Sequence, residues 1–425
     1  MVARITAGIR SYSPAALLYL VAAFMIGFAL DGGVFSVLFN LYLARIGYDT
    51  ELIGLVNGIA QLTFAVSSFP VGMLGARFGV RRMLVAGLIL MIVGMLALPM
   101  ADLLPDVIRV GWLIAGEVVL YIGLALYFVN SSPFLVAVVK PEQRSQVFGI
   151  QSTVFAFSAF AGGLVGGFLP GLFARLLASD LSSPIPYRYP LLIAGFGLLL
   201  SLGAIIAARD GDESVADAAA TSEQDQGGHP SLVLPSAILV VIAMMGLVRM
   251  FQVSGLAATS SFFNLYLDQQ LQIPTDQIGT IAAFSRLLAA PVGLMTPWLA
   301  RRLGGFGVVF GSTLVTGIAI LPIAFIPHWS AAGASLFAVV ALSSIRYASS
   351  MVYFFELVPI KQRATVSGMT EMSAGISFTL IAFAGGYIIK YVSYQALFLF
   401  GAALSIIGAL VFWFYFRQFE RKQAS

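Results

Sequence analysis

The feature that most constrains this chain is a series of long apolar runs. About 20 consecutive apolar residues span the hydrocarbon core of a bilayer as a helix. Only 10% of the residues are charged, against about a quarter in soluble proteins. We therefore predict an all-α polytopic membrane protein with twelve transmembrane helices. The twelve predicted spans are 15–43, 52–74, 83–101, 108–139, 146–174, 190–208, 233–267, 277–300, 307–327, 332–358, 365–389 and 395–416.

The sequence also contains an internal duplication, visible as three segments that recur in the same order at nearly one offset. FNLYL at 39–43 recurs at 263–267, Glu51–Gly54 recurs as Asp276–Gly279, and Arg-x-x-Val-x-Gly at 144–149 recurs at 363–368. Long repeats in an apolar chain are typical of transporters built from two halves. We expect two pseudo-symmetric bundles of six helices each.

A polar, acidic segment separates the two halves. Residues 209–231 contain six acidic side chains and no aromatic residue, so they cannot bury enough apolar surface to offset the cost of ordering. We expect an N-terminal bundle over 1–208, a cytoplasmic acidic linker over 209–231 and a C-terminal bundle over 232–425.

The distribution of Lys and Arg predicts the orientation. Fifteen of them fall on the side of the predicted helices that carries the termini and the linker, and five fall on the other side. The side rich in Lys and Arg faces the cytoplasm. We therefore expect a multi-pass protein of the cell membrane (inner or plasma membrane) with both termini cytoplasmic. The first apolar run continues through Asp31 without a small-residue cleavage site, which indicates a retained helix and not a signal peptide.

Ionisable side chains inside the predicted spans indicate a polar cavity. Each costs roughly 3 kcal/mol on insertion scales, so these groups must meet each other or water. The spans 83–101, 190–208, 307–327 and 395–416 have none, so we expect them to form an outer scaffold. The interior charges are Asp31, Glu117, Arg249, Arg286, Arg346 and Glu371.

These charges and their polar neighbours at helical spacing are the candidate site residues. The candidates for proton coupling are Asp31, Glu117 and Glu371. The candidates for the substrate cavity are Arg249, Arg286, Arg346, Asn40, Asn57, Gln61, Tyr121, Gln252, Asn264 and Tyr353. Structural ion pairs, of Asp31 with Arg249 and of Glu117 with Arg346 or Arg286, are an alternative for the charges. Asn40 and Asn264, in the duplicated FNLYL segments, are equally compatible with ligand contacts and with interhelical hydrogen bonds.

The segment GMLGARFGVRRML at 72–84 resembles the cytoplasmic loop signature of the Major Facilitator Superfamily, GxLaDrxGrkxxL. The matches are Gly72, Leu74, Arg77, Gly79, Arg81 and Leu84, with a weaker echo at Leu299, Ala300, Arg302 and Gly304. The resemblance implies the superfamily fold and a role in the cytoplasmic gate for Gly72, Arg77, Gly79 and Arg81. The family's acidic residue is replaced by Ala76 in the first half and by Arg301 in the second. Arg77 and Arg81 therefore need other partners, such as Glu142 or the linker acids. Anchoring at anionic lipid head groups is the alternative.

The fifth span resembles the family's antiporter signature. Matching glycines occur at Gly149, Gly162, Gly166 and Gly167, whereas Ser158 replaces a glycine and Gly163 replaces a proline. Small residues at this spacing allow close helix packing, and the resemblance implies export. The basic residue of the drug-antiporter signature in the fourth span is absent, and Glu117 is the charge there.

The composition excludes several kinds of chemistry. The chain has no cysteine, which excludes disulfides and thiolate metal sites. No lysine follows a glycine, so no phosphate-binding loop for ATP is present. No nucleophile–base arrangement indicates an enzyme, and the net charge of +4 requires no nucleic acid to explain it. We expect no cofactor and no metal.

Three functions remain compatible with the sequence. The favoured one is a proton-coupled exporter of small organic solutes that works as a monomer in the bilayer by alternating access, with sodium as the other candidate coupling ion. The second is an uptake symporter or exchanger for an anionic metabolite, because three arginines suit carboxylate and phosphate ligands. The third is a membrane sensor or lipid-handling protein without solute turnover.

Overall fold

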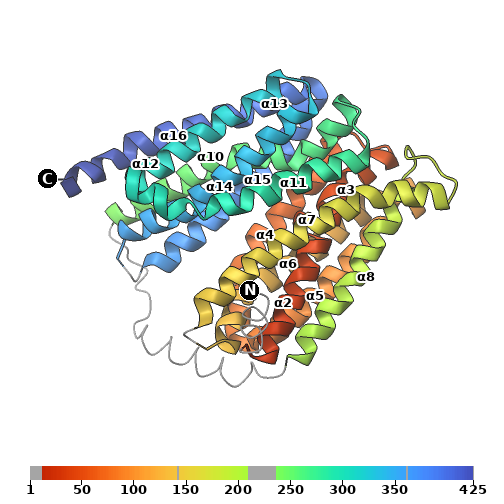
Figure 1. Cartoon of the computed structure of the whole chain (residues 1–425), viewed down its shortest axis with the longest axis horizontal. Helices are drawn as coiled ribbons and strands as arrows, with labels where there is room; N and C mark the ends of the chain where they lie inside the picture. The colour runs from red at the N-terminus through yellow and green to blue at the C-terminus, as the bar shows by residue number, and fades with distance from the viewer. Residues whose placement is uncertain (1–11, 141–142, 209–235, 360–361, 425) are drawn as a thin grey trace, which may run out of the picture.

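The computed structural model describes residues 12–140, 143–208, 236–359 and 362–424, all without a β-strand (Figure 1). The linker at 209–231 and Glu142 lie outside these residues. Eleven helices of the described part are long and apolar enough to cross a membrane. The remaining expected span, α11, is not among these eleven. It has 19 residues, which include the charged Asp276 and Arg286. The all-α membrane fold predicted from the apolar runs is therefore confirmed.

The helices form two bundles. The N-terminal half contains α2 (Pro14–Ala29), α3 (Val34–Ile46), α4 (Thr50–Phe78), α5 (Val80–Ala97), η1 (Leu98–Leu103), α6 (Asp106–Val138), α7 (Arg144–Leu176) and α8 (Ile185–Ala207). The C-terminal half contains α10 (Ser236–Leu265), the π-helical η3 (Tyr266–Gln270), α11 (Thr275–Gly293), α12 (Thr296–Ala319), α13 (Leu321–Phe325), α14 (Trp329–Glu356), α15 (Arg363–Tyr391) and α16 (Tyr394–Ala424).

Figure 1 shows the two bundles meeting at one end and diverging toward the other. We call the first the closed end; it carries the connections 47–49, 177–184, 271–274 and 392–393. The second, the open end, is where α2 begins, α8 ends and α10 begins.

The first span is interrupted, contrary to the continuous helix expected over 15–43. Between α2 and α3, Gly32 has a φ of +80°, a conformation that glycine adopts without strain. Ser36 Oγ donates a hydrogen bond to the Leu30 carbonyl (2.6 Å) and accepts one from the Gly32 N–H (2.9 Å). These bonds satisfy backbone groups that the break would leave unpaired inside a membrane. Asp31 therefore lies in the break and not within a helix.

The eighth span is also interrupted, contrary to the continuous helix expected over 277–300. α11 ends at Gly293, two residues after Pro291, whose ring disfavours a continuous helix. The turn between the eighth and ninth spans lies at Gly304, which has non-helical φ and ψ of 71° and 164° inside α12. Gly79, the equivalent residue of the first half, has a φ of 90° between α4 and α5.

Two glycine crossings join the halves at the closed end. A β-carbon at Gly54 of α4 would lie 2.4 Å from the Ala382 carbonyl oxygen of α15 and 3.0 Å from the Gly386 Cα. In the equivalent crossing, a β-carbon at Gly279 of α11 would lie 2.6 Å from the Gly167 Cα of α7. Both crossings therefore bring backbone against backbone, and they are related by the duplication.

Two ionic contacts reinforce the closed end. Arg45 in the last turn of α3 donates two hydrogen bonds to the Asp268 carboxylate in η3, at 2.5 and 2.8 Å. Lys390 Nζ lies 2.7 Å from an Asp49 oxygen and 2.5 Å from a Glu51 oxygen. Each contact connects the N-terminal half to the C-terminal half.

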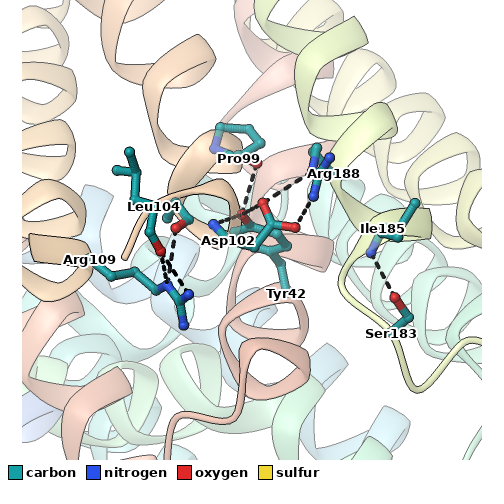
Figure 2. Close-up of polar contacts among 9 residues, drawn as sticks. Tyr42, Pro99, Asp102, Leu104, Arg109, Ser183, Ile185 and Arg188 are labelled. Carbon is teal, nitrogen blue, oxygen red and sulfur yellow. Dashed lines mark hydrogen bonds and ion pairs between the residues drawn. The ribbon is translucent and has the colours of Figure 1, made fainter. Parts of the chain in front are cut away.

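A polar cluster holds the N-terminal half together near the closed end (Figure 2). The Tyr42 hydroxyl donates to the Pro99 carbonyl (2.8 Å) and lies 3.0 Å from Asp102 Oδ1. Arg188 of α8 donates to both oxygens of Asp102, with its Nε 3.1 Å from Oδ1. This cluster fixes α3, η1 and α8 relative to one another within one half.

The outward faces of the helices are apolar. Phe196 and Leu200 of α8 and Phe414 of α16 are exposed, by 56%, 62% and 71%. In water, apolar surface of this kind would drive association. It is the surface expected of helices that contact lipid chains.

Candidate functional site

A cavity of about 820 Å³ lies between the halves. The N-terminal half contributes the break in the first span and residues of α3, α4 and α6, and the C-terminal half contributes residues of α10, α11, α14 and α15. None of the described lining residues comes from α5, α8, α12 or α16. The volume falls within the range of about 300–1,000 Å³ typical of small-molecule sites.

The cavity brings together most of the side chains that the sequence singled out. Those that line it are Asp31, Asn40, Asn57, Gln61, Tyr121, Arg249, Asn264, Arg286, Arg346 and Glu371. In the described part of the chain, no ion pair within 4.0 Å joins any of the charged members. The expected structural pair of Asp31 with Arg249 is therefore not formed in this conformation.

The C-terminal wall is strongly cationic. Arg249 on α10 and Arg346 on α14 are buried, and the Arg249 guanidinium lies 5.1 Å from the centroid of the Tyr347 ring. Arg346 Nη2 donates to the Ser343 hydroxyl at 3.1 Å. A guanidinium that stacks on an aromatic ring, as that of Arg249 does, retains N–H donors for a ligand.

Arg286 on α11 reaches across to the first half. A β-carbon at Gly32 would lie 3.3 Å from Arg286 Nη1, so the guanidinium packs directly on the break that carries Asp31. Asp31 itself is exposed to the cavity. The break therefore presents a carboxylate and accommodates a cation from the other half.

The duplicated asparagines connect the halves at the cavity wall. Asn40 Nδ2 donates to the Ser261 carbonyl at 2.9 Å, and its Oδ1 accepts from Asn57 Nδ2 at 2.9 Å. Asn264 Nδ2 donates to the Ser36 carbonyl at 2.8 Å. Both asparagines thus form interhelical hydrogen bonds while lining the cavity.

Glu117 is not part of the cavity wall. It lies on α6 one turn before Tyr121, is 1% exposed, and its Oε2 has no hydrogen-bond partner among the described residues. No ion pair with Arg346 or Arg286 forms in this conformation. Its side chain is enclosed within the N-terminal half.

Gln252 and Tyr353 also lie outside the cavity, contrary to expectation. Gln252 is fully buried beside the wall, and its side-chain atoms lack partners among the described residues. Tyr353 is two turns beyond Arg346 and packs in an aromatic cluster with Phe306 and Phe412, at centroid distances of 6.2 and 5.6 Å. Helical spacing gave the face of α14 but not the depth at which the cavity ends.

The sequence reasoning missed the aromatic wall and several hydroxyl groups. The additional polar lining residues include Ser343, Ser344 and Tyr347. The phenylalanines among the lining residues are Phe35, Phe39, Phe64, Phe128, Phe263 and Phe378. Tyr347 follows Arg346 directly, which was a usable signal, whereas phenylalanines in an apolar span cannot be told from lipid-facing ones.

The loop between α4 and α5 is anchored within its own half. Arg81 donates to the carbonyls of Ile205 and Ile206 at the end of α8, at 3.3 and 2.5 Å. The Arg77 guanidinium lies 5.3 Å from the centroid of the Phe78 ring. Gly79 makes the turn, and Gly72 has Val129 nearby on α6. Arg81 thus connects the start of α5 to the C-terminal end of α8.

The glycines of the fifth span have separate partners. On α7, Gly162 and Gly166 face the broken first span, where their β-carbons would lie 2.9 Å from the Gly33 Cα and 3.0 Å from the Val34 Cα. Gly167 faces α11 of the other half, and Gly149 has open space around it. Three of the four glycines therefore permit close backbone contact.

Comparison with known proteins agrees with this architecture. The model of the Major Facilitator Superfamily matches residues 15–345 and 247–425. Among solved structures, the chain resembles the D-xylose–proton symporter, with a TM-score of 0.72 and 15% identity over 94% of this chain and 97% of that chain. It also resembles a mutant of the nucleoside transporter NupG, with a TM-score of 0.75 and 14% identity over 94% and 98%.

A third similar structure is that of a bacterial homolog to the human lysosomal transporter Spinster, in an inward-facing and occupied conformation. Its TM-score is 0.66, with 16% identity over 95% of this chain and 96% of that chain. These TM-scores show a shared fold. The sequence matches no curated protein. The two matched ranges cover nearly the whole sequence, and the chain belongs to the Major Facilitator Superfamily, whose fold indicates secondary transport of small solutes.

Proposed function

We propose that this protein is a proton-coupled secondary transporter that exports small organic solutes by alternating access. The observation that carries the proposal is the cavity of about 820 Å³ whose wall is built from both halves and contains ionisable side chains of both. A site shared between two bundles is exposed to one side or the other when the bundles rock, as in other transporters built from repeats.

The coupling site in this proposal is Asp31. It lies in the helix break, is exposed to the cavity, and sits beside the place where Arg286 contacts the first half. A carboxylate there attracts Arg286, and protonation removes that attraction. Protonation of Asp31 thereby changes the relative free energy of the states in which the halves are together or apart. Glu371 lines the opposite wall and is the second candidate.

The open end is assigned to the cytoplasm. The excess of Lys and Arg at the termini and loops of that end supports this orientation, as does the likeness to an inward-facing structure. A cavity open to the cytoplasm is the loading state of an exporter. The resemblance of α7 to the family's antiporter signature also supports export, and three of its matching glycines make close backbone contacts.

The test is transport in vesicles that contain the purified full-length chain with its proposed cytoplasmic face outward. With an imposed pH gradient, the wild type should accumulate a substrate found by screening, and Asp31→Asn should lose this accumulation while retaining exchange at equilibrium. Asp180→Asn, at an exposed residue of the closed end, is the matched control. Undiminished coupled accumulation in Asp31→Asn would remove Asp31 from the mechanism.

Accumulation in vesicles of the opposite orientation would reverse the proposed direction. Binding of solutes without movement of any of them would favour the sensor function instead.

A further inference from the structure

The C-terminal wall of the cavity contains two buried arginines. Arg249 and Arg346 are 6% and 1% exposed. Neither forms an ion pair within 4.0 Å in the described part of the chain. Buried charges are normally paired, because removing them from water is costly.

Several of their donors point at no acceptor in the described chain. Arg346 uses Nη2 to bond Ser343, but its Nε and Nη1 have no partner, and the Nε of Arg249 has none. A guanidinium donates up to five hydrogen bonds in a planar fork that fits carboxylate and phosphate. The pair therefore contributes buried donors that no described residue satisfies, on two residues that line the cavity.

The other charges of the wall do not neutralise this pair. Glu371 lines the same cavity from α15, but it is one carboxylate against two guanidiniums. Asp31 and Arg286 are the other charged lining residues, and they carry one charge of each sign. The C-terminal wall thus keeps an uncompensated positive charge.

The opposite wall has a different chemistry. Phe35, Phe39, Phe64 and Phe128 line the cavity from α3, α4 and α6. The rings of Phe35 and Phe39 stack with centroids 4.5 Å apart. These rings provide an apolar surface across the cavity from the cationic one, and aromatic surfaces bind flat apolar groups well.

We propose that the solute is an amphiphilic organic anion whose oxyanion group binds Arg249 and Arg346 and whose apolar body packs against the aromatic wall of α3, α4 and α6. This inference rests on the proposed transport function and narrows its substrate class. A neutral sugar lacks the charge, and a small inorganic anion lacks the apolar body. The oxyanion is a carboxylate or a phosphate ester, which offer the same bidentate acceptors.

The test is binding to the purified full-length protein in detergent, measured calorimetrically with four probes. 2-Naphthoate and 2-naphthyl phosphate carry both the oxyanion and the apolar body, 2-naphthamide carries only the body, and acetate carries only the oxyanion. The two naphthyl anions should bind at least about tenfold more tightly than naphthamide or acetate, because charge-assisted hydrogen bonds would be lost or unsupported. A difference between naphthoate and naphthyl phosphate identifies which oxyanion the site prefers.

Arg346→Gln and Arg249→Gln should each weaken binding of the naphthyl anions about tenfold to a hundredfold. Arg346→Lys, which keeps the charge but loses the fork, should give an intermediate loss. Arg175→Gln, at an exposed arginine of α7, should bind as the wild type does. A melting curve of each variant confirms that it is folded.

Equal binding of naphthamide and naphthoate, or wild-type affinity in both Arg→Gln variants, would overturn the inference. Neutral solutes that the wild type carries in vesicles, without binding of either naphthyl anion, would overturn it while leaving the transport function intact. Absence of both binding and transport for charged and neutral solutes would overturn the two together.

Discussion

Asn40 and Asn264 occupy equivalent positions in the two halves, and each donates its side-chain amide to a backbone carbonyl of the other half. The first bonds Ser261 at 2.9 Å and the second bonds Ser36 at 2.8 Å. The duplicated FNLYL segments therefore form a reciprocal pair of bonds about the pseudo-two-fold axis. Because both side chains also line the cavity, a bound solute lies next to the bonds that hold the halves together.

Removing these bonds should favour the state that opens at the closed end. Asn40→Ala deletes one cross-half hydrogen bond and Asn264→Ala deletes two, to the carbonyls of Ser36 and Val37. Each bond is worth about 1 kcal/mol, which is about a fivefold change in the ratio of the two states. The chain has no natural cysteine, so spin labels at Met73→Cys and Thr365→Cys report only the open end. Their distance should shorten in both variants. Asn130→Ala, which loses a bond inside α6 only, should leave it unchanged.

The glycine crossings should resist any added side chain. A methyl group at Gly386 would lie 2.4 Å from the Thr50 carbonyl oxygen, whereas Gly368 on the same helix has nothing within 4 Å. Gly386→Ala should weaken the closed end by about 1–3 kcal/mol, the usual cost of overpacking, and Gly368→Ala should not. Labels at Ser182→Cys and Val392→Cys measure the separation there. An unchanged distance distribution in Gly386→Ala would contradict the crossing as described.

The ion pair of Arg45 with Asp268 should couple the halves measurably. The pair is bidentate, and its side chains are 20% and 9% exposed, so it is better sheltered than an ordinary surface pair. A double-mutant cycle with Arg45→Gln and Asp268→Asn should give a coupling energy of about 1–2 kcal/mol for closure. The same cycle on Arg109 and Asp106, a pair within the first half with Asp106 largely exposed, should give a value near zero for closure. Additivity in the first cycle would exclude a gating role for the pair.

Acid should weaken the closed end through Asp49. The hydrogen bond from the Lys390 ammonium holds the pKa of Asp49 below its usual range, near 3.9 in peptides. This contribution to closure is complete above that range and is lost as the pH falls through the lowered pKa. Because the Asp49 side chain is 50% exposed, the effect should be about 0–1 kcal/mol.

The measurement for this prediction is the label distance at the closed end between pH 7 and pH 3. Asp49→Asn keeps the hydrogen bond that caps Leu52 but cannot titrate, so it should reduce the pH dependence. An identical pH response in this variant would assign the effect to other acids.

Glu117 should tolerate its neutral isostere. It is enclosed in α6 with no cation at ion-pair distance among the described residues, and an isolated buried charge would be very costly. Glu117→Gln should therefore change the thermal stability by less than about 1 kcal/mol, whereas Glu117→Lys should be strongly destabilising. A large loss of stability in Glu117→Gln would indicate that the ionised form has a structural role.

The sequence predicted the fold and most of the cavity because both depend on the free energy of placing individual residues in a membrane. An ionisable group such as Arg249 or Arg346 inside an apolar span must face a polar space, and its position could be read without coordinates. The duplication placed Asn40 and Asn264 at matching depths. The same reasoning singled out Asp31 and Glu371, which both line the cavity.

Other features depend on contacts that no local pattern encodes. Tyr353 shares a face with Arg346, but the aromatic cluster around Phe306 and Phe412 takes up its ring. The pairing of Arg45 with Asp268 depends on which end of the molecule is shut. The break at Gly32 was concealed by apolar residues on both sides, although the sequence Asp31-Gly32-Gly33 could have indicated it.

The backbone contacts at Gly54 and Gly279 affect how easily the molecule switches. Glycine surfaces have no rotamers to freeze or release, so parting them changes side-chain entropy little and costs mainly dispersion energy, which vanishes within a short distance. The transition therefore has a short range and a sharp threshold. A solute that contacts both bundles therefore needs to contribute only a small binding free energy to change which state is favoured.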